Sequence, residues 1–172
     1  MILRRSVGVL IFTATTACGG VQERFKPLVT GDPVPVYAAQ LIDGDSAAVG
    51  TDEPQQLTLL NVWATWCVPC QKEFPDLQKI HSDYGGRGLR VLAVSVDDNG
   101  TEERIREFAK VYSATFPIAH DPDGRIRDLY QGIGIPESYL ISADGRLLFR
   151  NAGAFPEGAA VIRAAIEAAL AK

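Results

Sequence analysis

The stretch LTLLNVWATWCVPC spans residues 57–70 and decides the fold of this chain. Its first half is apolar and partly β-branched, which is typical of a buried central strand. The strand runs directly into Cys67 and Cys70, and apolar residues then recur at helical spacing from Val68 to about Tyr84. A strand that leads into a helix in this way places Cys67 at the helix N-terminus.

Strand and helix patterns alternate around this stretch. Such an order favours an α/β fold, with a central mixed β-sheet flanked by helices on both faces and a C-terminal β-hairpin and helix. We expect Thr101 to cap the second helix with its side chain. The expected strands are 36–42, 57–63, 89–96, 115–119, 138–142 and 147–150, and the expected helices are 68–84, 101–112, 125–130 and 156–170.

Length and composition exclude several classes of protein. A chain of 172 residues fits one compact domain better than two. With 47% hydrophobic and 22% charged residues, it has the composition of an ordinary globular protein. The net charge is −4 and the basic residues are scattered, so we expect no nucleic-acid partner.

The N-terminal segment has the pattern of a secretory signal peptide, which we assign to residues 1–17. Arg4 and Arg5 precede an apolar run that continues from Val7 to Ala17 and ends in small residues. This run is much shorter than the roughly 20 residues that a transmembrane helix needs. The mature protein is therefore expected outside the cytoplasm.

Cys18 follows the signal peptide directly. The segment Thr15 to Gly19 resembles a bacterial lipobox, with Thr15 where leucine is usual, and we expect Cys18 to be lipidated and to tether the protein to a membrane. The alternative is ordinary cleavage after Ala17, which leaves Cys18 a free thiol. Residues 19–30 are expected to form a tether, and residues 31–172 the folded domain.

Three uses of the Cys67/Cys70 pair compete. As a structural brace, the pair closes too small a loop to constrain much of the unfolded chain. As half of a zinc site, it lacks a second half, because Cys18 belongs to the tether and His81 and His120 lack ligand spacing. We therefore expect no metal or cofactor and a structural role for both histidines. Redox exchange is the use that remains.

The position of the pair suits that chemistry. At a helix N-terminus, the unpaired N–H groups and the helix dipole favour the thiolate of Cys67. A cysteine with a pKa of ~8.5 is only about 3% ionised at pH 7, whereas one with a pKa of ~7 is about half ionised. Cys70 lies one helical turn further on, where it can attack a mixed disulfide on Cys67 and release the substrate. Trp66 is expected to form an apolar platform beside Cys67, and Trp63 to lie in the core.

Several motifs resemble known families. Residues 66–70 and Gly134-Ile135-Pro136 resemble the thioredoxin superfamily, and the likeness covers about residues 30–172. Residues 60–67 with 73–75 are similar to its TlpA/ResA branch. Residues 134–141 and 149–153 are most similar to the DsbE/CcmG proteins of cytochrome c maturation.

This resemblance implies roles for four further residues. Ile135-Pro136 would be a cis-proline loop beside the dithiol, where Ile135 offers its backbone to an extended substrate peptide. Glu73 matches an acidic helix position and would modulate proton movement to and from Cys70, unless it is an ordinary solvated charge. Glu137 would influence partner choice, unless it is a plain surface carboxylate.

The function implied is that of an extracytoplasmic thiol:disulfide oxidoreductase. We expect it to act as a reductase on a protein disulfide, with apocytochrome c or haem-ligation factors as candidate partners and a membrane dithiol protein as electron donor. A general or copper-centre-assembly reductase is an alternative. A non-enzymatic lipoprotein or zinc-binding module is another. A peroxiredoxin would need a different motif around its reactive cysteine.

Overall fold

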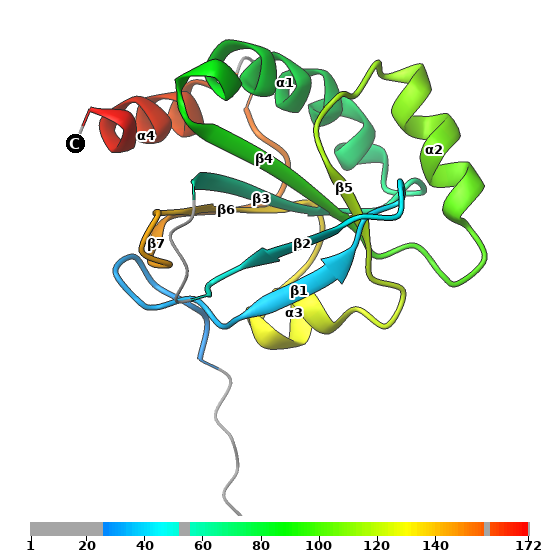
Figure 1. Cartoon of the computed structure of the whole chain (residues 1–172), viewed down its shortest axis with the longest axis horizontal. Coiled ribbons are helices and arrows are strands. Elements are labelled where there is room, and N and C mark those ends of the chain that lie inside the picture. The colour runs from blue at the N-terminus through cyan, green and yellow to red at the C-terminus, as the bar shows by residue number, and fades with distance from the viewer. Residues whose placement is uncertain (1–25, 52–55, 157–158, 172) are drawn as a thin grey trace, which may run out of the picture.

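The structure is a computed structural model that describes residues 26–51, 56–156 and 159–171 (Figure 1). The predicted signal peptide, Cys18 and most of the predicted tether lie outside these residues. At the end of the predicted tether, Leu28 packs against the domain and the Thr30 hydroxyl donates to the Leu148 carbonyl. Within the described ranges, no helix is both long enough and apolar enough to cross a membrane.

The centre of the domain is a five-stranded mixed sheet in the order β5-β4-β3-β6-β7. Strand β3 (Leu57–Trp63) is the central strand and is buried along its whole length. It pairs in parallel with β4 (Leu89–Ser95) and antiparallel with β6 (Glu137–Ile141). Strand β5 (Ile118–His120) extends the parallel side, and β7 (Leu147–Ala152) completes the predicted hairpin with β6.

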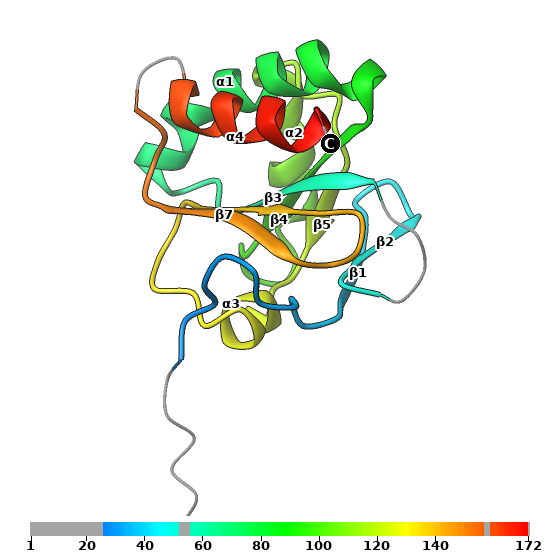
Figure 2. The same cartoon turned by 90° about the vertical axis from the view of Figure 1, so that its left-hand side faces the viewer.

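Helices cover both faces of this sheet, as predicted (Figure 2). The longer helices lie on one face, and a short helix and a two-stranded ribbon lie on the other. The first group is α1 (Val68–Tyr84), α2 (Glu102–Val111) and α4 (Ala160–Leu170); the second is α3 (Arg125–Leu129) with β1 (Tyr37–Gln40) and β2 (Ser46–Val49); a 3-10 turn, η1 (Gly85–Arg87), follows α1.

Side chains of β3 alternate between these two layers, because successive residues of a strand point to opposite faces. Leu59 and Trp63 join the hydrophobic cluster under α1, α2 and α4, whereas Leu60 and Val62 join the cluster on the α3 side. The Trp63 ring lies 4.5 Å from that of Phe74 on α1, which confirms Trp63 as a core residue. Asn61 points to the same face of the sheet as Leu59 and Trp63, so its buried side-chain amide faces the α1 side.

Several details differ from the sequence-based expectation. Strand β2 was not predicted, because Ser46-Ala47-Ala48-Val49 has few of the residues that favour strands; it forms by pairing with β1. Thr101 occupies the N-cap of α2, but its hydroxyl donates to the Asp98 carbonyl and makes no bond to a helix N–H. The predicted side-chain cap is therefore wrong.

Candidate active site

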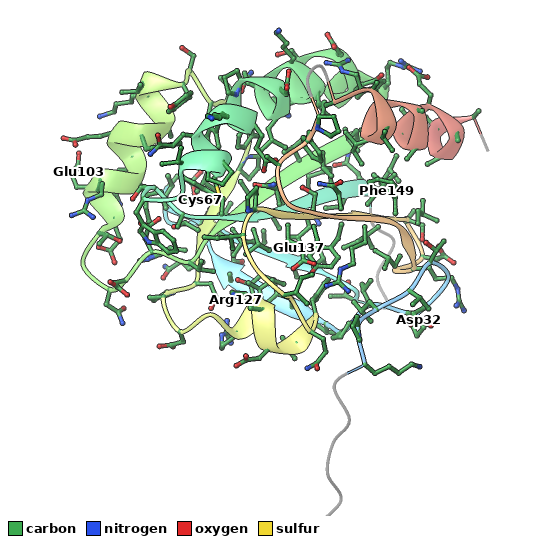
Figure 3. The ribbon with its side chains drawn as sticks, turned by 180° about the vertical axis from the view of Figure 1, so that it is seen from behind. Asp32, Cys67, Glu103, Arg127, Glu137 and Phe149 are labelled. Carbon is green, nitrogen blue, oxygen red and sulfur yellow. A yellow bond between two sulfur atoms is a disulfide. The ribbon has the colours of Figure 1, made fainter. Side chains whose placement is uncertain are left out.

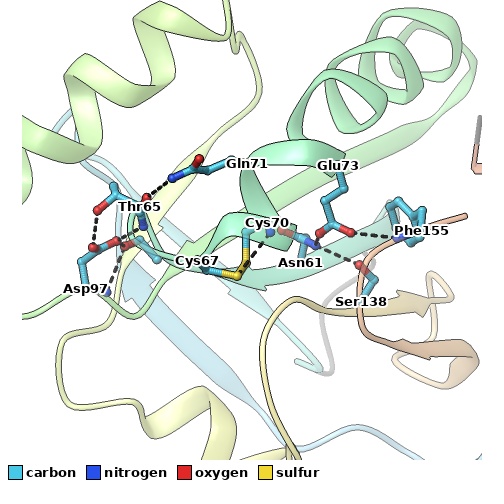
Figure 4. The surroundings of a disulfide bond; sticks show 10 residues. Asn61, Thr65, Cys67, Cys70, Gln71, Glu73, Asp97, Ser138 and Phe155 are labelled. Carbon is cyan, nitrogen blue, oxygen red and sulfur yellow. Dashed lines mark hydrogen bonds between the residues drawn. A yellow bond between two sulfur atoms is a disulfide. The ribbon is translucent and has the colours of Figure 1, made fainter. Parts of the chain in front are cut away.

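Cys67 and Cys70 form a disulfide at the start of α1 (Figure 4). Cys67 is the N-cap residue of the helix, and its sulfur accepts the main-chain N–H of Cys70 at 3.2 Å. Cys67 is 5% exposed, whereas Cys70 is fully buried. The helix N-terminus thus directs an N–H group and the positive end of its dipole at the outer sulfur, which favours a thiolate there after reduction.

The loop before Cys67 is held by residues that the sequence reasoning missed. Asp97, just beyond the end of β4, accepts hydrogen bonds from the N–H and the hydroxyl of Thr65 at 2.8 and 2.6 Å. The side-chain amide of Gln71 donates to the Thr65 carbonyl at 2.8 Å. One feature of the sequence could have pointed to Asp97: it follows an apolar strand, β4, that pairs in parallel with β3, the strand that leads to the cysteines.

Glu73 lies one helical turn after Cys70 and is 2% exposed, so the alternative of a solvated charge is wrong. Its carboxylate accepts the side-chain amide of Asn61 at 2.7 Å and the main-chain N–H of Phe155 at 3.1 Å. The second amide proton of Asn61 goes to the hydroxyl of Ser138, its register partner on β6, at 2.9 Å. Figure 4 shows this network beside the disulfide.

Burial raises the pKa of Glu73 to about 7, although the hydrogen bonds from Asn61 and Phe155 oppose the shift. A carboxyl with this pKa changes its protonation near neutrality and can both take up and release a proton. The Asn61 carbonyl oxygen has no partner among the described residues. Rotation of this amide by 180° would offer that oxygen to a protonated Glu73.

The Ile135–Pro136 peptide bond is cis, as predicted. Its place beside the dithiol follows from the sheet, because Glu137 pairs with Val62, so the start of β6 lies next to the end of β3. The Pro136 carbonyl accepts the N–H of Gly153 at 2.8 Å. Within the described part of the chain, no hydrogen bond uses the backbone of Ile135, which leaves it open to an extended peptide.

Glu137 is 1% exposed, so the surface-carboxylate alternative is also wrong. In Figure 3 it lies in the interior, between the sheet and α3. Its carboxylate accepts the Arg150 guanidinium at 2.7 Å and the Ile133 N–H at 3.2 Å. Arg150 in turn donates to the Gln131 carbonyl at 3.2 Å. These contacts tie Glu137 to the loop before the cis-proline.

Exposed apolar side chains lie close in sequence to the cysteines and to the cis peptide bond. Trp66, Val68 and Ile133 are 62%, 57% and 65% exposed, and all three lie within three residues of a cysteine or of the cis peptide bond.

The two histidines lie in separate parts of the fold. His81 packs near the Phe116 ring, and His120 contacts the Asp97 carbonyl and Glu102. Among the described residues, no three potential metal ligands cluster.

A disulfide at the start of a helix, beside a cis-proline and on a sheet of this order, defines a thiol:disulfide oxidoreductase of the thioredoxin-like fold. The chain belongs to the AhpC/TSA family, whose profile matches residues 30–150.

Individual relatives agree with this class. The thiol-disulfide oxidoreductase ResA of Oceanobacillus iheyensis is 31% identical over 151 residues, which cover 85% of this chain and 78% of the relative. A solved structure from Chlorobium tepidum, assigned as the thiol:disulfide interchange protein DsbE, is 31% identical, with a TM-score of 0.75 over 83% of this chain and 99% of that one. StoA from Bacillus subtilis is 26% identical, with a TM-score of 0.64 over 79% and 98% of the two chains.

Proposed function

We propose that this protein is an extracytoplasmic reductase that keeps the cysteines of a partner protein reduced, with apocytochrome c or a haem-ligation factor as its substrate. The observation that carries the proposal is the contact between the Cys67 sulfur and the Cys70 N–H at the start of α1. Similarity to ResA and to DsbE supports the choice of partner. The unused backbone of Ile135 supports a protein substrate that binds in extended form.

The reaction would proceed by two exchanges. The Cys67 thiolate of the reduced protein attacks the partner disulfide, so that a mixed disulfide forms and one partner sulfur leaves as a thiolate. Cys70 then loses its proton and attacks the Cys67 sulfur, which expels the second partner sulfur. The partner gains two electrons and two protons, and Cys67 and Cys70 end as the disulfide described above. A membrane protein with its own dithiol would restore the reduced form.

Trapping of the mixed disulfide tests this proposal. In cells that express Cys70→Ala, the first exchange should stop at a covalent complex on Cys67, because the resolving thiol is missing. Cys67→Ala is the matched control and should trap nothing. Recovery of a haem-ligation factor, or of proteins with a haem-attachment Cys-x-x-Cys-His segment, supports the proposal. Recovery only of proteins unrelated to cytochromes identifies a general thiol reductase and contradicts it.

We further propose that lipidated Cys18 anchors the protein to the membrane from the extracytoplasmic side. Cys18→Ser should then move the protein from the membrane fraction to the soluble fraction. An unchanged distribution between the two fractions contradicts the anchor and leaves the exchange chemistry untouched.

A further inference from the structure

A buried carboxylate lies at the edge of the sheet where β3, β4 and β5 end. Asp97 is 1% exposed, and its two oxygens accept three hydrogen bonds. Two of them come from Thr65 and the third from the Ser95 hydroxyl at 2.6 Å. Carboxylates that accept several short hydrogen bonds hold their donors firmly, because a donor that loses such a bond is left buried and unpaired.

Asp97 is itself fixed from two sides. Its N–H donates to the Ser95 hydroxyl at 3.1 Å, and His120 on β5 lies 2.9 Å from its carbonyl through Nε2. Since a carbonyl oxygen only accepts, the His120 nitrogen is the donor in this contact. Contacts with β4 and β5 therefore hold Asp97 in place. Its carboxylate in turn binds Thr65, which follows β3.

Thr65, which binds Asp97, lies two residues before the nucleophile Cys67. Its N–H and hydroxyl bind Asp97, and its carbonyl accepts from Gln71, so all three of its polar groups are engaged. The Cys67 N–H closes the short turn by donating to the Ala64 carbonyl at 3.1 Å. A shift of Thr65 would thus change where the Cys67 sulfur lies relative to α1.

We propose that Asp97 is a positioning residue for thiol–disulfide exchange: by clamping Thr65, it holds the Cys67 sulfur in the orientation that attack requires. Substitution at sulfur needs the attacking sulfur in line with the bond that breaks, and small displacements of a reacting group are costly to the rate. The inference concerns the exchange step itself, whichever partner is reduced.

Variants at Thr65 test the clamp with little change of shape. Thr65→Val keeps the volume but removes the hydroxyl that binds Asp97, and Thr65→Ser keeps the hydroxyl. Thr58→Val is the matched control, because Thr58 is buried like Thr65 but lies in β3, at the end of the strand away from the cysteines. Its hydroxyl also donates a hydrogen bond, in this case to the Gln56 carbonyl at 3.0 Å. Asp97→Ala removes the whole clamp.

The measurement is the rate constant with which each reduced full-length protein cleaves a small aromatic disulfide, together with its melting temperature. We expect the rate constant to fall about fivefold in Thr65→Val, the loss that one buried hydrogen bond of ~1 kcal/mol implies, and about 100-fold in Asp97→Ala. Thr65→Ser should react at close to the wild-type rate.

Thr58→Val should lose stability and react at the wild-type rate. Wild-type rates in Thr65→Val, or equal losses of rate in Thr65→Val and Thr58→Val, overturn the inference and leave Asp97 with a purely structural role. The wild-type rate constant tests the exchange activity by itself, whereas the ratio between variants tests the clamp. If Asp97→Ala does not fold, the Thr65 variants still decide the question.

Discussion

The carboxylate of Glu73 joins the helix that carries the dithiol to the segment that precedes α4, because it accepts the main-chain N–H of Phe155 at 3.1 Å. A single buried acid therefore touches three parts of the fold, the third being Asn61 on the central strand. Its protonation must affect both the stability of the protein and the chemistry of the neighbouring thiols.

The first prediction concerns stability and pH. The pKa of Glu73 rises from 4.5 in the unfolded chain to about 7 in the fold, so between these values the folded state holds a proton that the unfolded state has lost. Glu73 therefore stabilises the fold least above pH 7, and stability should fall as pH rises from 4.5 to 7. The full shift corresponds to about 3 kcal/mol.

Urea unfolding of the oxidised protein at pH 4.5 and pH 8 measures this loss. Glu73→Gln has no carboxyl to titrate and should lose correspondingly less stability over the same interval. Glu107→Gln, which removes an exposed carboxylate on α2, should follow the wild type. Parallel curves for wild type and Glu73→Gln would show that Glu73 does not titrate with a raised pKa.

The second prediction concerns the rate of exchange. Above pH 7 the ionised Glu73 can take up the proton that Cys70 must lose, and general-base catalysis contributes ~10²-fold or more. Glu73→Gln should therefore resolve mixed disulfides at least about tenfold more slowly at pH 8, with a smaller difference at pH 6. Stopped-flow release of a chromophoric thiol measures this step. A pH profile identical to that of the wild type would leave Glu73 with a structural role.

The third prediction concerns Asn61, whose buried side-chain amide donates to Glu73. Asn61→Asp would place a second carboxylate against Glu73, where the amide now donates at 2.7 Å. Two adjacent carboxylates cannot both ionise easily, so they should share a proton and titrate as a pair. We expect a loss of about 2 kcal/mol in unfolding free energy at pH 8 and a smaller loss at pH 5. Asn99→Asp, on an exposed loop, should lose little at either pH.

The fourth prediction concerns the buried ion pair of Glu137 and Arg150, whose side chains are 2% and 16% exposed. Glu137→Gln leaves the guanidinium poorly paired and should cost about 3 kcal/mol. A double-mutant cycle with Arg150→Gln should give a coupling energy of more than ~1 kcal/mol. The exposed pair of Arg87 and Glu167 provides the comparison, and its coupling energy should be smaller, because solvent screens exposed ion pairs. Equal couplings for the two pairs would contradict the structural role of Glu137.

Local sequence patterns predicted the fold because its elements are strongly marked. Strand β3 is apolar at most of its positions, and Asp144-Gly145 signals the turn of the hairpin. Strand β2 escaped prediction because its sequence is weak and it depends on pairing with β1. Helix α4 begins at Ala160, later than the alanine-rich pattern suggested.

The site was predictable only in part. Spacing along the chain identified Cys67, Cys70 and Glu73, which lie at the N-cap and in the first two turns of α1. The contacts around these residues come from other segments. Asp97 reaches Thr65 from the loop that follows β4, and Ser138 on β6 reaches Asn61 through sheet register. Such contacts depend on how the strands align, and no local pattern of residues encodes that alignment. For the same reason, the burial of Glu137 became visible only in the fold.

The different environments of the two tryptophans make the intrinsic fluorescence of the protein a reporter of binding at the cysteines. Trp63 is fully enclosed and Trp66 is 62% exposed, although only two residues separate them. Their emission should therefore consist of a blue component that iodide cannot quench and a red component that it can. A partner that covers the cysteines would shield the red component alone, so complex formation could be followed by light without any attached dye.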